Sequence, residues 1–205
     1  MKVNDWLKQS VKSLEKAGIG TARLDCLVLL EDVTAKDRSW LLAHSETLLE
    51  DSQKSLLQSQ LARRAKHEPL AFIRGKTEFY GREFIISESV LEPRPESETM
   101  LELLKQLKPD PESVILDAGT GSGAIGITAA LELSQCRVEL CDIDEAALGV
   151  AKQNDAKHQT GLHIYKSDLL QQVETDLDII LANLPYVPDD YQINESALLE
   201  PKIAI

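Results

Sequence analysis

The 205-residue chain lacks any apolar run of the roughly 18 residues that a membrane-spanning helix needs. Its first segment, "MKVNDWLKQS", lacks the apolar core of a signal peptide. With 43% apolar and 27% charged residues, the composition is that of an ordinary globular protein. We therefore expect no membrane partner and a cytoplasmic location.

Cysteine and basic residues are also scarce. The three cysteines, Cys26, Cys136 and Cys141, have no C-x-x-C spacing, so they indicate neither a disulfide framework nor a zinc site. We expect reduced thiols and no bound metal. Only 22 Lys and Arg stand against 34 Asp and Glu, a net charge of −12. Nucleic-acid binding usually depends on a basic surface, and the one small basic cluster, Arg63, Arg64 and Lys66, fits a solvated helix face. Charge therefore favours a protein or small-molecule partner over direct contact with nucleic acid.

The hydrophobic pattern changes near residue 70. Before it, apolar residues recur with the helical period until Pro69, which predicts a helical bundle over residues 1–70. The next stretch, "LAFIRGKTEFYGREFIIS", alternates β-branched and aromatic residues around two glycines, which predicts a linking β-hairpin over residues 71–90. The remainder, residues 91–205, opens with the helical segment "RPESETMLELLKQLK".

Strands and helices then alternate, which predicts βαβ units. The expected segments are "SVILDAG", "SGAIGITAALELS", "CRVELCDID", "EAALGVAKQNDAKH", "LHIYKSD" and "LDIILAN". The predicted fold is α/β, a doubly wound Rossmann-like parallel sheet with helices on both faces. In such sheets ligands bind beyond the carboxyl ends of the strands, where the strand order reverses. The predicted strand ends carry the run from Asp117 to Gly123, then Asp142, Asp168 and Asn183. We expect these four ends to form one site.

The first strand end, "DAGTGSG", is the most informative. Gly119, Gly121 and Gly123 allow a tight turn and the close approach of a ligand to the backbone. From Gly121 the chain also satisfies G-x-G-x-x-G, with Asp142 about twenty residues on, so a dinucleotide-dependent dehydrogenase is one alternative. Against it, the carboxylate of Asp117 would repel a pyrophosphate.

An anion at this position suits the ammonium and sulfonium groups of S-adenosylmethionine. The pattern therefore favours a methyl-donor site in which Asp142 accepts hydrogen bonds from ribose hydroxyls. Asp144, directly before the next expected helix, fits the N-cap position better than Asp142 does.

Several segments together resemble the protein-(glutamine-N5) methyltransferases that modify peptide chain release factors. "RLDCLVLLEDVTAKDRSWLLAH" is similar to the helical domain of that family, and "HEPLAFIRGKTEFYGREF" to its linking hairpin. "LEPRPESE" resembles its P-R-P-E-T-E segment, "LDAGTGSGAIGI" its methyl-donor loop and "ANLPYV" its N-P-P-Y tip. The resemblance covers essentially the whole chain, and Leu184 stands where the family has its first proline.

The resemblance implies a function and a set of site residues. The substrate would be the glutamine in the G-G-Q loop of a release factor, methylated on its side-chain nitrogen, and the helical bundle would bind the release factor. The methyl donor, S-adenosylmethionine, would be held by Asp117, Gly119, Thr120, Gly121, Ser122, Gly123, Asp142, Asp168, Leu169 and Asn183. The substrate would be held by Asn183, Leu184, Pro185 and Tyr186, of which Asn183, Pro185 and Tyr186 would be catalytic.

The chemistry of the tip fits a primary amide substrate. Asn183 can accept one amide hydrogen with its side-chain oxygen, and the carbonyl of Leu184 can accept the other. Pro185 fixes the turn and favours an extended Leu184, and the ring of Tyr186 can pack against the planar amide.

Other functions fit parts of the pattern. Adenine N6 and guanine N2 also present two hydrogens on a planar nitrogen, so a nucleic-acid N-methyltransferase is the first alternative. A non-catalytic protein that binds a release factor through the bundle is the second. The resemblance also implies three further strands after Ile205, so we expect an N-terminal portion of a longer enzyme, with an incomplete sheet, low stability and little turnover.

Overall fold

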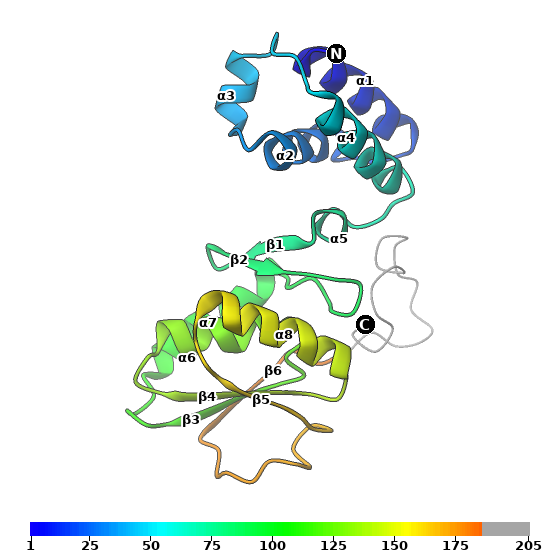
Figure 1. The fold of residues 1–205 in the computed structure, drawn as a ribbon. Coiled ribbons are helices and arrows are strands. Elements are labelled where there is room, and N and C mark those ends of the chain that lie inside the picture. Colours follow the sequence, from blue (N-terminus) through cyan, green and yellow to red (C-terminus); the bar gives the residue numbers. More distant parts are fainter. Residues whose placement is uncertain (186–205) are drawn as a thin grey trace. The chain divides into compact units, whose positions relative to one another are not determined.

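The computed structural model describes residues 1–185, and the chain divides into two compact units, Met1–Arg74 and Gly75–Ile205 (Figure 1). The first unit is helical. Its helices are α1 (Val3–Lys16), α2 (Ala22–Thr34), α3 (Arg38–Ala43), α4 (Asp51–Arg64) and α5 (Leu70–Arg74). Apolar side chains of the first four helices form its core, including Trp6, Leu14, Leu29, Leu41 and Leu57.

Helix α4 ends earlier than the sequence pattern suggested. The helical period of the sequence continues to Pro69, but α4 stops at Arg64 and turns follow, with His67 in the left-handed region at φ 66°. The Arg64 side chain binds α2, where its Nε donates to Asp25 Oδ2 over 2.7 Å. The expected solvated basic face is therefore wrong for Arg64, and Arg63 is paired with Glu68.

The hairpin is shorter than predicted. It consists of β1 (Lys76–Phe79) and β2 (Arg82–Ile85), paired antiparallel. Tyr80 and Gly81 form its two-residue turn, both with positive φ, which matches the right-handed twist of the strands. The preceding apolar residues of the quoted stretch form α5 instead of a strand, with the backbone N–H groups of Phe72 and Ile73 donating to Pro69 O.

The parallel sheet follows the hairpin. A 3-10 turn, η1 (Pro95–Ser97), leads into α6 (Glu98–Leu107), and then strands and helices alternate as predicted. The elements are β3 (Val114–Ala118), α7 (Ala124–Glu132), β4 (Arg137–Asp142), α8 (Glu145–His158), β5 (His163–Lys166) and β6 (Ile179–Ala182). The strand order is β5-β4-β3-β6, so the order reverses between β3 and β6. An α/β fold with a doubly wound strand order is thus confirmed.

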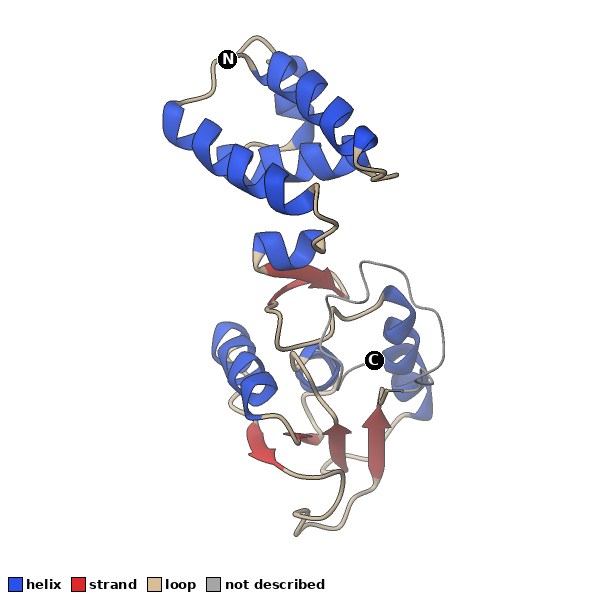
Figure 2. Cartoon of the chain, turned by 90° about the vertical axis from the view of Figure 1, so that its right-hand side faces the viewer, coloured by secondary structure: helices blue, strands red, loops and turns tan. Residues whose placement is uncertain are grey.

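The two faces of the sheet are covered differently. Ile115 of β3 packs into a core with Leu101 and Leu104 of α6, whereas its neighbour Leu116 packs on the opposite face near Leu177. Figures 1 and 2 show α6, α7 and α8 on one side of the strands. The expectation of helices on both faces is not met within residues 1–185, because the connection from β5 to β6 consists of turns.

Candidate functional site

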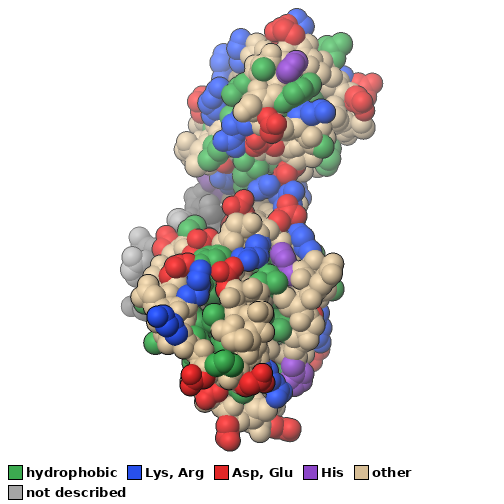
Figure 3. Space-filling view, turned by 90° about the vertical axis from the view of Figure 1, so that its left-hand side faces the viewer, with side chains coloured by type: hydrophobic (Ala, Val, Ile, Leu, Met, Phe, Trp, Pro, Cys, Tyr) green, Lys and Arg blue, Asp and Glu red, His purple; other side chains and the backbone are tan. Residues whose placement is uncertain are grey.

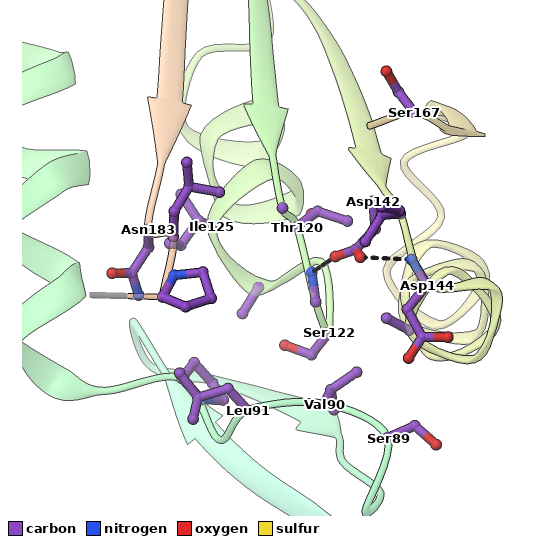
Figure 4. A pocket seen from close by; sticks show the side chains of 18 of the residues that line it. Ser89, Val90, Leu91, Thr120, Ser122, Ile125, Asp142, Asp144, Ser167 and Asn183 are labelled. Atoms are coloured by element: carbon purple, nitrogen blue, oxygen red, sulfur yellow. Dashed lines mark hydrogen bonds between the residues drawn. The ribbon is translucent and has the colours of Figure 1, made fainter. Parts of the chain in front are cut away.

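A pocket of about 210 Å³ lies at the carboxyl ends of the parallel strands. Among the described strands, residues at or directly after each carboxyl end contribute to its wall, and the segment that follows the hairpin lies across from them (Figure 4). Of the predicted site residues, the lining includes Gly119, Thr120, Gly121, Ser122, Asp142, Asp168, Leu169, Asn183, Leu184 and Pro185. The structure therefore brings together the four strand ends that the sequence analysis connected.

The glycine loop is held by backbone hydrogen bonds. The N–H groups of Gly119 and Thr120 both donate to Cys141 O, over 2.9 and 3.0 Å, which fixes the loop to the end of β4. Gly121 has φ +56°, and a Cβ built on it would meet no atom within 4 Å. The backbone at Gly121 is therefore open to the close approach of a ligand.

The third glycine of the G-x-G-x-x-G pattern packs α7 against the sheet. A Cβ on Gly126 would come within 2.7 Å of the Leu140 side chain and 2.9 Å of the Asp117 side chain. Gly123, which is the N-cap of α7, does not line the pocket but allows the turn at φ +81°. This pattern is thus explained by close helix–strand packing as much as by ligand contact.

Asp117 lies behind the glycine loop and not in the pocket wall. The residue is 1% exposed, and its Oδ2 accepts hydrogen bonds from Thr120 Oγ1 over 2.6 Å and from Gly126 N over 2.8 Å. Burial raises its pKa to about 6, although these hydrogen bonds act in the opposite direction. The expected direct contact with a positively charged ligand is therefore corrected to a role in fixing the loop and the start of α7.

Asp142 connects two strand ends. Its Oδ2 accepts from Gly121 N over 2.8 Å, and its Oδ1 accepts from Asp144 N over 3.0 Å, as Figure 4 shows. Each carboxylate oxygen can accept more than one hydrogen bond, so capacity remains for ligand hydroxyls. Asp144 is the N-cap of α8, with its Oδ1 accepting from Ala146 N, as the sequence predicted.

The end of β5 contributes Ser167, Asp168 and Leu169. Leu169 has a positive φ of 49°, and its carbonyl accepts a hydrogen bond from Ser167 Oγ over 2.7 Å. This local bond supports a conformation that a leucine rarely adopts. Leu169 is 51% exposed, so the apolar surface at this end of the pocket is accessible.

The tip after β6 forms the opposite side of the pocket from Asp142 (Figure 4). Asn183 Nδ2 donates to Ser97 Oγ over 3.2 Å. Leu184 approaches the glycine loop, because a Cβ on Gly119 would lie 2.7 Å from Leu184 Cδ2. Pro185 is also part of the wall, and Tyr186 lies outside the described residues.

The wall opposite the strand ends was not predicted from the sequence. Ser89, Val90, Leu91 and Pro93 line the pocket from the segment between the hairpin and α6. Only the resemblance of "LEPRPESE" pointed to part of this segment, and it assigned no contact to it. The first turn of α7 and the start of α8 also contribute lining residues, namely Ala124, Ile125, Ile143, Asp144 and Ala147.

A buried asparagine fixes the end of the hairpin, which leads into this wall. Asn154 of α8 is fully buried; its Oδ1 accepts from Ile85 N over 2.7 Å, and its Nδ2 donates to Ile85 O and to Ser122 O. One side chain therefore connects the end of the hairpin with the glycine loop. No sequence motif marks Asn154, because its partners lie 32 and 69 residues away.

Within residues 1–185, no group of three His, Cys, Asp or Glu side chains is arranged to hold a metal ion. In the same range, no helix has the length and apolar character needed to cross a bilayer.

Two family models match the chain. The PrmC N-terminal domain matches residues 5–75, and the methyltransferase small domain matches residues 96–198. The second match alone covers half of the chain and contains all the strand ends that line the pocket.

Curated relatives match both regions together. The release factor glutamine methyltransferase of Coxiella burnetii is 37% identical over 188 residues, covering 90% of this chain and 68% of the relative. That of Koribacter versatilis is 37% identical over 181 residues, covering 87% of this chain and 65% of the relative. The chain thus spans about two thirds of the length of these relatives.

A solved structure, the Pyrococcus abyssi tRNA (uracil-54, C5)-methyltransferase in complex with S-adenosyl-L-homocysteine, is 18% identical and covers 51% of this chain and 26% of its own, with a TM-score of 0.43. So partial a likeness does not bear on function. The two domain matches and the curated relatives bear on function, and they confirm the resemblance that the sequence motifs indicated. The chain belongs to the release factor glutamine methyltransferase family.

Proposed function

We propose that this chain transfers a methyl group from S-adenosylmethionine to the side-chain amide nitrogen, N5, of the glutamine in the G-G-Q motif of a peptide chain release factor. The observation that carries the proposal is the pocket in which the glycine loop, Asp142 and Asn183 meet at the carboxyl ends of β3, β4 and β6. Family membership supplies the class of substrate.

The pocket residues suit S-adenosylmethionine, which supplies an electrophilic sulfonium methyl group when bound. Gly121 leaves open space in front of its Cα, so a ligand can lie directly against the backbone there. Asp142 offers a carboxylate for ribose hydroxyls, and the exposed Leu169 offers apolar surface for the adenine. Asp168 and the backbone of Thr120 and Ser122 complete this half of the pocket.

The tip residues suit the glutamine amide. An amide nitrogen is a poor nucleophile because its lone pair is delocalised into the carbonyl, so alignment is the main contribution that the chain can make. Alignment can supply roughly 7–11 kcal/mol in favourable intramolecular models. In our proposal, Asn183 Oδ1 and the Leu184 carbonyl accept the two amide hydrogens, while Pro185 fixes the turn and Tyr186 covers the amide plane.

The helical unit carries the proposed release-factor contact. On the face drawn in Figure 3, its Lys and Arg side chains lie among acidic and hydrophobic ones. Several of its basic side chains are paired with carboxylates, including Arg38 with Glu31 and Arg74 with Asp32. Such mixed charge supports a protein partner over the nucleic acid of the alternative function.

The test has two stages and uses the whole 205-residue chain. Calorimetry with S-adenosylmethionine should show binding, whereas NAD should show none. Excess chain incubated with labelled methyl donor and a purified release factor, long enough to detect slow transfer, should then place any label on the G-G-Q glutamine, located by mass spectrometry. Label on nucleic acid would overturn the proposal, and methyl-donor binding without transfer would favour the non-catalytic alternative.

A further inference from the structure

Ser97 lies at a helix N-cap position, but its side chain does not form the hydrogen bond that a serine usually makes there. It ends η1 and is the N-cap residue of α6, but its side chain makes no capping hydrogen bond. Its φ of −69° and ψ of −16° are helical, because η1 runs directly into α6. An N-cap serine normally has an extended backbone, from which the hydroxyl accepts a hydrogen bond from the first turn. The Ser97 hydroxyl is thus available for another partner.

That partner is Asn183, which lies 86 residues away at the end of β6. Asn183 Nδ2 donates to Ser97 Oγ over 3.2 Å, and Ser97 is only 9% exposed. The hydrogen bond is part-buried, with its Ser97 end shielded from water, so it restrains the Asn183 side chain more than a fully exposed bond would. The restrained side chain belongs to the pocket wall.

The orientation of the Asn183 amide decides what the tip can bind. One end of a carboxamide accepts hydrogen bonds and the other end donates them. With Nδ2 directed to Ser97, the oxygen is the end that remains to accept a hydrogen from a ligand. Rotation of the amide by half a turn would present N–H donors to the N–H donors of a substrate amide, and this arrangement would repel the substrate.

We propose that Ser97 is a positioning residue for methyl transfer, whose hydroxyl holds Asn183 Nδ2 so that Asn183 Oδ1 accepts a hydrogen of the substrate amide. This inference rests on the proposed function, in which Asn183 binds a primary amide. Ser97 itself touches neither the substrate nor the methyl donor in this proposal. Its hydroxyl oxygen contributes by orienting the Asn183 side chain.

The first test observes the hydrogen bond directly, without any turnover. In the ¹⁵N-labelled chain, the side-chain NH₂ signals of Asn183 are assigned by their loss in Asn183→Asp. The matched pair is Ser97→Thr, which keeps a hydroxyl, and Ser97→Val, which has the same shape without one. We expect Ser97→Val to shift these signals and to speed their hydrogen exchange about tenfold, because about one hydrogen bond is lost. Ser97→Thr should resemble the wild type.

Ser97→Ala provides the same comparison if the larger side chains disturb the fold, which the backbone amide spectrum would reveal. Signals of Asn183 that are identical in the wild type, Ser97→Val and Ser97→Ala would overturn the inference.

The second test separates positioning from structure. At saturating S-adenosylmethionine, Ser97→Val should lower kcat for glutamine methylation about tenfold, with Ser97→Thr within about threefold of the wild type. The affinity for S-adenosylmethionine, measured by calorimetry, should be equal in all three. If the wild type methylates the glutamine and Ser97→Val does so equally fast, Ser97 has no positioning role, although the proposed function stands. If the wild type does not methylate it, the proposed function fails, and the NMR comparison still decides whether Ser97 orients Asn183.

Discussion

The two halves of the pocket are built in different ways. At the glycine loop, backbone N–H groups supply most of the contacts: Gly119 and Thr120 donate to Cys141 O, Gly121 to Asp142 and Gly126 to Asp117. At the tip, one hydrogen bond between the side chains of Asn183 and Ser97 crosses from β6 to the start of α6.

The difference shows where each half is sensitive to substitution. A loop held by many backbone contacts keeps its shape when one side chain is lost, so such a loss should weaken binding only moderately. A tip that depends on the orientation of one amide should lose its chemistry when that amide is removed. Substitutions in the half that we propose binds the methyl donor and in the half that we propose aligns the substrate should therefore differ in their effects.

The largest effect is expected at the tip. Asn183→Ala should reduce methyl transfer about a hundredfold or more, since one aligning hydrogen bond can contribute roughly 3 kcal/mol to the transition state. The affinity for S-adenosylmethionine should stay largely unchanged by calorimetry. Asn183→Asp keeps an acceptor oxygen and should lose less than Asn183→Ala. Normal transfer by Asn183→Ala would show that the tip does not align the substrate.

A second large effect is expected in the buried carboxylate behind the loop. Because burial raises the pKa of Asp117 from 3.8 to about 6, the folded state favours the protonated form. The associated stability is present below pH 3.8 and is lost as the pH rises through 6, by about 3 kcal/mol in the free energy of unfolding.

Asp117→Asn should remove this dependence, because an amide does not titrate in this range. Urea unfolding of both proteins at pH 4 and pH 7.5 would measure it, and the wild type should lose stability relative to the variant at the higher pH. The opposite trend would mean that the hydrogen bonds from Thr120 and Gly126 outweigh burial.

A moderate effect is expected at Asp142, where we propose that the ribose binds. Asp142→Ala should weaken S-adenosylmethionine binding by about 1–3 kcal/mol, because the hydroxyls lose a charged acceptor. Asp142→Asn keeps one acceptor oxygen and should fall between the wild type and Asp142→Ala. Titration calorimetry gives these affinities, and thermal unfolding controls for the lost hydrogen bond from Gly121. Unchanged affinity in both variants would remove Asp142 from the binding site.

The smallest effect is expected at Leu184. Leu184→Pro retains the backbone carbonyl that we propose as the second acceptor, and Leu184 is 37% exposed. Methyl transfer should change by less than about threefold, a difference within roughly 0.7 kcal/mol. A loss comparable to that of Asn183→Ala would show that the contact of Leu184 with the glycine loop matters more than its carbonyl.

Local chemistry explains the elements that were predicted well. Helix α8 has the predicted bounds, because Asp144 caps its start and left-handed Gln159 follows its end. The hairpin turn at Tyr80 and Gly81 likewise depends only on neighbouring residues. By contrast, "LAFIR" forms α5, in which Ala71, Phe72 and Ile73 are all buried in succession. Consecutive buried residues carry no period, so the sequence could not distinguish a helical turn from a strand.

By itself, the sequence determined the alternation of strands and helices, because this depends on the spacing of apolar residues along the chain. It also determined the polar or glycine residues that end each strand. Only the tertiary structure decided that Asp117 lies behind the loop, that residues 89–93 form the facing wall, and that Ser97 meets Asn183. Those contacts follow from the strand order β5-β4-β3-β6, which places distant segments beside one another. No local pattern encodes that order, since it is selected by the packing of the whole sheet unit.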